Sequence, residues 1–138
     1  MHYWVSSLLL LLMTANLYGQ SNTAEPNAIE LEEISQNGRY RITLSPVSTA
    51  NQLRKIHQWR VYIETIDRVA VTNAHFEFDG RMPAHRHGLP TQPAFEGHIG
   101  DGIYLVGGVK FSMSGDWELK IDGTVEGESL YAVFKFTL

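Results

Sequence analysis

The stretch IHQWRVYIETI, residues 56–66, decides the fold class, because apolar and polar side chains alternate along most of it. Trp59, Val61 and Ile63 fall on one side, and mainly polar residues fall between them. A two-residue repeat is the spacing of a β-strand with one buried and one solvent-facing side. The stretch therefore predicts a long strand facing a core. His57 lies on the apolar side, where packing is a commoner role for histidine than metal binding.

The same alternation recurs before and after that stretch. Turn-forming glycines, prolines and aspartates separate the segments that show it. Further strands are predicted over residues 38–44 and 69–79, three strands over 103–122 with Gly107-Gly108 as a turn or bulge, and a closing strand over 130–138. Seven or eight short strands with a core tryptophan, Trp117, predict an all-β, immunoglobulin-like sandwich of two antiparallel sheets.

Length and composition favour one domain, which we place at residues 37–138. The chain has 138 residues, a formal net charge of −4 and no cysteine. No cluster of Lys and Arg resembles the basic surface that a phosphate backbone requires, so nucleic acid is not an expected partner. Without disulfides the fold must rest on its apolar core, which is compatible with an oxidising compartment but does not require one.

The N-terminal segment is typical of a secretory signal peptide, predicted over residues 1–19. A leucine block, Leu8–Leu12, lies in an apolar core of about eleven residues, short of the roughly 20 that span a bilayer. We expect a periplasmic or secreted protein. Because no Lys or Arg precedes the core, an uncleaved segment tethering the chain to the inner membrane is the alternative. Residues 20–36 predict an acidic polar tether, with a short helix over 28–34 as a second reading.

The stretch RMPAHRHGLP, residues 81–90, carries the chemistry that stands out in this chain. It places two histidines and a methionine within six residues, flanked by prolines that restrict the loop before any ligand binds. Imidazole and thioether are ligands of late transition metals, with thioether favouring Cu(I). In extended backbone His85 and His87 would point to one side and Arg86 away. The loop predicts a copper site, with zinc less favoured; a turn carrying surface histidines is the alternative.

Three more residues are candidate metal ligands. Met82 precedes Pro83 in a polar loop, where burial is not expected, so a ligand or lid role is favoured. Met113 lies between an aromatic pair, where a core thioether is somewhat favoured, although the sandwich would be able to bring it to Met82. His98, in a glycine-rich segment, is equally a further ligand or a loop histidine bonded to backbone.

Two motifs of fixed order carry a family resemblance. DGRMPAHRHGLPTQP is followed by GxYxxxGxxFxMxGxWEL, which runs from Gly102 to Leu119. This run resembles the YtkA-like domain family, to which FixH-like proteins are related. The resemblance implies an immunoglobulin-like sandwich and an envelope location in a family whose biochemical role is poorly defined. Some relatives are associated with copper handling or cytochrome oxidase maturation, an association that favours the copper reading.

Catalytic motifs do not appear in the sequence. It has no cysteine, no glycine-bracketed serine of the nucleophile-elbow kind and no H-E-x-x-H helix, so we expect no enzyme. Two hypotheses remain. The first is an envelope module that carries or buffers copper and exchanges it with a donor or acceptor protein. The second is a metal-independent adaptor that presents the histidine loop or an edge strand to an envelope complex.

Overall fold

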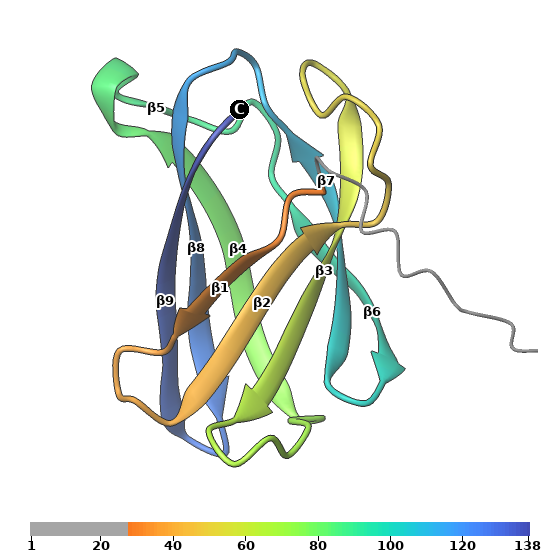
Figure 1. Cartoon of the computed structure of the whole chain (residues 1–138), viewed down its shortest axis with the longest axis vertical. Helices are drawn as coiled ribbons and strands as arrows, with labels where there is room; N and C mark the ends of the chain where they lie inside the picture. Colours follow the sequence, from red (N-terminus) through yellow and green to blue (C-terminus); the bar gives the residue numbers. More distant parts are fainter. Residues whose placement is uncertain (1–27) are drawn as a thin grey trace, which may run out of the picture.

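The structure is a computed structural model that describes residues 28–138 as two antiparallel β-sheets packed face to face (Figure 1). One sheet has the strand order β1-β2-β3-β7-β6 and the other β5-β4-β8-β9. The elements are β1 (Leu31–Ile34), β2 (Tyr40–Pro46), β3 (Ile56–Thr65), β4 (Ala74–Met82), the 3-10 turn η1 (Pro83–His85), β5 (His87–Gly88), β6 (Ala94–Gly100), β7 (Ile103–Lys110), β8 (Asp116–Val125) and β9 (Glu128–Thr137). The predicted all-β sandwich is confirmed, with nine strands in the described residues instead of seven or eight.

The acidic segment that we expected to be a tether ends in a strand. β1 pairs antiparallel with β2, with Leu31 opposite Leu44 and Ile34 opposite Arg41. The helix considered over residues 28–34 is therefore wrong, because this segment instead satisfies the backbone groups of the β2 edge. The expected signal peptide and the first part of the tether lie outside the described residues. Within residues 28–138, no helix is long and apolar enough to cross a bilayer.

The strand predicted over residues 69–79 begins later, at Ala74. Arg68 has a left-handed backbone conformation, with φ of 67°, in the turn after β3. Beyond this turn the chain still bonds to β3, since the Val71 N–H donates to the Ile63 carbonyl at 2.9 Å. Residues 69–73 therefore lie along the first sheet before β4 begins in the second.

Residues 103–122 form parts of two strands, not three. The Gly107-Gly108 pair does not end β7, because Gly108 has φ of 77° and the strand continues to Lys110. The register between β3 and β7 shifts in this region, with Trp59 opposite Val106 and His57 opposite Val109. The pair is thus a bulge, one of the two readings that the sequence allowed.

The core lies between the sheets and is centred on aromatic side chains. Trp59 and Trp117 are fully buried, and the Phe111 ring packs edge-on against both, at centroid distances of 5.9 and 5.1 Å. Burying each such side chain stabilises the fold by about 1.5–3 kcal/mol. The predicted core positions of both tryptophans are confirmed. His57 is half-buried, and burial together with the charge of Lys55 lowers its pKa.

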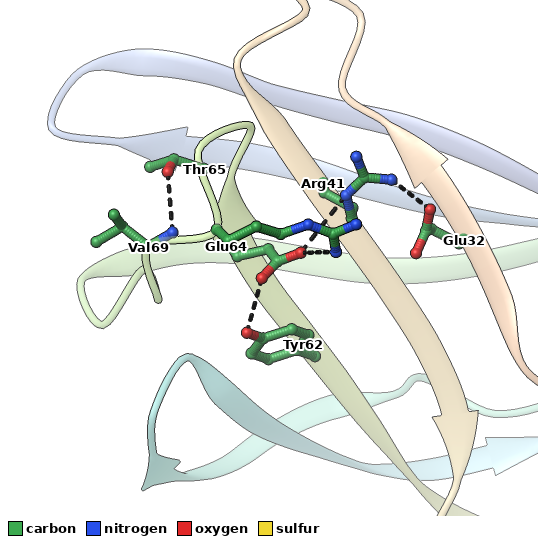
Figure 2. Close-up of polar contacts among 7 residues, drawn as sticks. Glu32, Arg41, Tyr62, Glu64, Thr65 and Val69 are labelled. Atoms are coloured by element: carbon green, nitrogen blue, oxygen red, sulfur yellow. Dashed lines mark hydrogen bonds and ion pairs between the residues drawn. The ribbon is translucent and has the colours of Figure 1, made fainter.

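A charged network joins β1, β2, β3 and the turn after β3 (Figure 2). The Glu64 side chain, only 5% exposed, accepts hydrogen bonds from Arg68 and Tyr62 and lies 3.5 Å from Arg41 Nε. Arg41 also pairs with Glu32 on β1. Burial by itself would raise the pKa of Glu64, but the hydrogen bonds from Tyr62 and Arg68 and the charges of Arg68 and Arg41 outweigh it and hold the pKa below its ordinary value.

Candidate metal centre

The histidine loop is a tight hairpin at one end of the sandwich, between β4 and β5 (Figure 1). Pro83 begins the 3-10 turn η1, a position where its missing N–H costs nothing. Arg86 then takes a left-handed conformation, with φ of 54° and ψ of 34°, which turns the chain back onto β4. As a result His87 lies directly opposite Met82 in the ladder. The expectation of extended backbone from His85 to His87 is therefore wrong.

The two imidazoles nevertheless lie close together. The His85 and His87 ring centroids are 5.9 Å apart, with an interplanar angle of 36°. The left-handed turn at Arg86 brings the second ring back toward the first. His85 is exposed, whereas His87 is half-buried against the edge of the Trp117 ring, at a centroid distance of 5.9 Å. The pair thus has one fixed member and one solvent-facing member.

Each ring nitrogen of His87 has a defined neighbour. Nδ1 lies 3.1 Å from the Gly88 carbonyl oxygen, and Nε2 lies 3.4 Å from Met113 Sδ. A neutral imidazole whose Nδ1–H donates to the carbonyl carries a lone pair on Nε2. In that tautomer two electron-pair donors, nitrogen and sulfur, face each other with no hydrogen atom between them. Such a separation is suited to a cation that accepts both lone pairs.

The two methionines approach His87 from different elements. Met82 is 1% exposed and belongs to the core, so our expectation that it would not be buried is wrong: it occupies the last inward-facing position of β4. Cross-strand partners on one face have Cβ atoms about 4.5–5.5 Å apart. The half-buried Met113 packs against the core from the β7–β8 connection. His87 thereby lies near two methionine sulfurs.

Trp117 holds Met113 in position, a role that sequence reasoning missed. Its indole N–H donates to the Met113 carbonyl at 3.0 Å, across the turn that contains Gly115. At Gly115, which has φ of +128°, an added Cβ would come within 2.9 Å of the Met82 terminal methyl group. The spaced MxGxW pattern is the sequence signal for this arrangement, because its three named residues all touch the candidate centre or its support.

His98, the remaining candidate ligand, lies elsewhere, on β6 of the other sheet. Its ring packs on Tyr104 at a centroid distance of 4.7 Å and an interplanar angle of 31°. Together with the exposed His75 it lines a cavity of about 350 Å³. The structure therefore brings together His85, His87, Met82 and Met113, and places His98 against an aromatic side chain.

Oxygen donors do not contribute to this cluster. Across residues 28–138, no three side chains drawn from His, Cys, Asp and Glu are grouped so that they would be able to hold a metal ion. A metal centre at the hairpin therefore depends on thioether sulfur as well as imidazole nitrogen. This requirement separates the cluster from zinc and calcium sites, which use thiolate, imidazole or oxygen ligands.

These features define a small β-sandwich with a histidine–methionine cluster at the end of one hairpin. The family model for YtkA-like domains matches residues 34–122, from the end of β1 into β8. The chain therefore belongs to the YtkA-like family. The match includes the histidine hairpin and the Met113–Trp117 turn. Comparisons with curated proteins and with solved structures gave no match.

Proposed function

We propose that this YtkA-like sandwich is an envelope module that binds copper and carries or buffers it. His87 and Met113 supply the central nitrogen and sulfur ligands, Met82 a second sulfur and His85 a second imidazole. The observation that carries the proposal is the 3.4 Å separation of His87 Nε2 from Met113 Sδ, with Nδ1 against a carbonyl oxygen. Imidazole with thioether is a donor set that suits copper, which makes zinc the less favoured ion.

The separation of the two donor atoms fits a single ion. Bonds of about 2.0 Å to nitrogen and 2.3 Å to sulfur, lengths typical of first-row ions such as zinc, would meet at roughly 100° across 3.4 Å. That angle leaves room for two more ligands. His85 is exposed beside His87, so its ring is able to rotate toward the ion. Met82 lies on the inner side, opposite His87 in the hairpin ladder.

The cellular setting is part of the proposal. Its support is the signal-like N-terminal segment and the location implied by the family resemblance. In this setting the module would receive copper from, or pass it to, a second envelope protein. Contact with the membrane is expected only if the N-terminal segment is retained.

Metal titration of the full-length protein tests the proposal. Wild type should bind about one copper ion, whereas His85→Ala/His87→Ala should bind none while its melting temperature without metal is nearly unchanged, because His85 is exposed and His87 lies at the surface end of the hairpin. His75→Ala, an exposed histidine on β4, is the matched control and should bind as wild type does. Normal copper binding by the double variant would overturn the proposal.

The alternative, a metal-independent adaptor, has one observation in its favour. Phe95 and Ile99 on the edge strand β6 are 59% and 58% exposed, and an exposed apolar edge is able to pair with a partner strand. Affinity capture from envelope extracts distinguishes the two functions. A partner recovered equally with and without a copper chelator, and lost with Phe95→Lys/Ile99→Lys, would favour the adaptor.

A further inference from the structure

We infer that the histidine–methionine cluster selects monovalent copper over Cu(II) and zinc. This inference rests on the proposed function, because it names the ion that the same site takes. Three observations support it: the softness of the thioether donors, the positive charge of Arg86 on the hairpin and the shape of the inner wall.

The donor set is soft and uncharged. Two thioethers and two imidazoles lie at the hairpin, and no Asp, Glu or Cys joins the two histidines there among the described residues. Thioether sulfur favours Cu(I), whereas Cu(II) prefers square-planar or tetragonal nitrogen and oxygen ligands. Among the described residues, the cluster has two imidazole nitrogens and no third His, Asp, Glu or Cys ligand. The cluster is therefore short of the hard ligands that a divalent ion needs.

The charge of Arg86 disfavours a divalent ion at the hairpin. A cavity of about 450 Å³ beside the hairpin is lined by Arg81 and Arg86 as well as by Met82 and His87. Arg81 is neutralised by Glu118, which accepts two hydrogen bonds from its guanidinium at 2.9 and 2.7 Å. Arg86 forms no ion pair within the described part of the chain. Because neutral ligands leave the ion's charge intact, its repulsion by Arg86 is twice as large for a divalent ion as for Cu(I).

The inner wall leaves little room for water ligands. Met82 and Trp117 are each 1% exposed, and the Trp117 ring edge faces His87. An ion held between His87 and Met113 would have the buried Met82 and Trp117 side chains on its inner side, and solvent on the side of the exposed His85 and the adjoining cavity. Cu(I) tolerates few ligands, whereas zinc in proteins is almost always four-coordinate. The shape of the wall therefore supports the same choice as the donor set.

Competition titrations of the full-length protein test the selectivity. Cu(I) is supplied without oxygen against a chromophoric Cu(I) chelator, while Cu(II) and zinc are titrated against chelators of known affinity. Cu(I) should bind more tightly than either divalent ion. Met113→Leu, a near-isosteric change that removes the sulfur ligand, should weaken Cu(I) binding by about a hundredfold and Cu(II) binding much less. His75→Ala should change neither affinity.

X-ray absorption at the copper edge gives a readout that does not depend on the variant's folding. Wild type loaded with Cu(I) should show sulfur scatterers in the first shell. A first shell of nitrogen or oxygen scatterers alone would overturn the selectivity while copper binding stands. Binding of Cu(II) or zinc as tight as that of Cu(I) would overturn it too, as would an equal loss of Cu(I) and Cu(II) affinity in Met113→Leu. If no ion binds to wild type, the proposed function fails as well.

Discussion

His87 and His85 are neighbours in sequence but are unequal as ligands. His87 has Nδ1 against the Gly88 carbonyl and Nε2 facing sulfur, so little freedom is lost when an ion binds. His85 is exposed and must be ordered at that moment. We expect His87→Ala to weaken copper binding at least about tenfold more than His85→Ala, the scale of a supporting interaction around a metal. Competition titration of the single variants measures the difference, and equal losses would contradict the unequal roles.

Gly115 leaves the space that the Met82 methyl group occupies. We expect Gly115→Ala to destabilise the fold by about 1–3 kcal/mol, because the added Cβ meets the Met82 terminal methyl group at 2.9 Å and φ is +128°. Urea unfolding measures this loss. Gly127→Ala is the control, since Gly127 also has positive φ, at +83°, but no atom within 4 Å of the added Cβ. Equal losses in the two variants would show that the contact with Met82 has no energetic role.

At the scale of elements, Glu64 links β2, β3 and the turn after β3, and its ionisation makes the stability of this contact depend on pH. Its pKa is lower in the folded protein than its ordinary value of 4.5. The ionised carboxylate therefore contributes stability that is complete above this ordinary value and is lost as pH falls through the lower, folded value. We expect wild type to lose unfolding free energy more steeply than Glu64→Gln below pH 4.5. Denaturant unfolding across an acid pH series measures the two slopes.

At neutral pH the same substitution tests the strength of the network. We expect Glu64→Gln to cost about 3 kcal/mol, because the buried charge that pairs with Arg68 and Arg41 is removed and Arg41 is left with only its exposed partner, Glu32. Glu32→Gln removes the exposed partner of Arg41 and should cost less than about 1 kcal/mol. If Glu32→Gln and Glu64→Gln lowered the free energy of unfolding by similar amounts, burial of the carboxylate would have no effect on stability.

The predictability of the strands follows their length and burial. β3, β8 and β9 each have ten residues, with buried positions that follow the alternation read from the sequence. β1 has four residues and β5 has two, which are too few to show a two-residue repeat. These strands form because β2 and β4 offer them free backbone N–H and C=O groups. Likewise the start of β4 depends on the turn at Arg68, which alternation does not report.

At the scale of the whole molecule, copper should stabilise the fold. A ligand that binds only the folded state adds about 2.7 kcal/mol at a free concentration of 100 times Kd. We expect the melting temperature of wild type to rise with Cu(I), and that of His85→Ala/His87→Ala to stay constant. Differential scanning calorimetry under anaerobic conditions measures both. A rise in the double variant would place the stabilising copper away from the hairpin.

The candidate site was predictable in its composition but not in its geometry. His85 and His87 stand out in the sequence because two imidazoles are spaced by one residue between prolines. The approach of Met113 requires the sandwich to bring the β7–β8 connection to the β4–β5 hairpin, which a linear pattern cannot specify. Burial of Met82 was missed because the polar character of the loop hides that β4 continues to this residue.

The contact between His87 and Met113 joins positions 26 residues apart in a chain without cysteine. An ion bridging them would act as a removable cross-link, closing a circuit through the chain that a disulfide bond would close permanently. Handing the ion to a recipient would reopen that circuit and loosen the hairpin end. Resistance of the β4–β5 turn to a protease would then report whether the module is loaded.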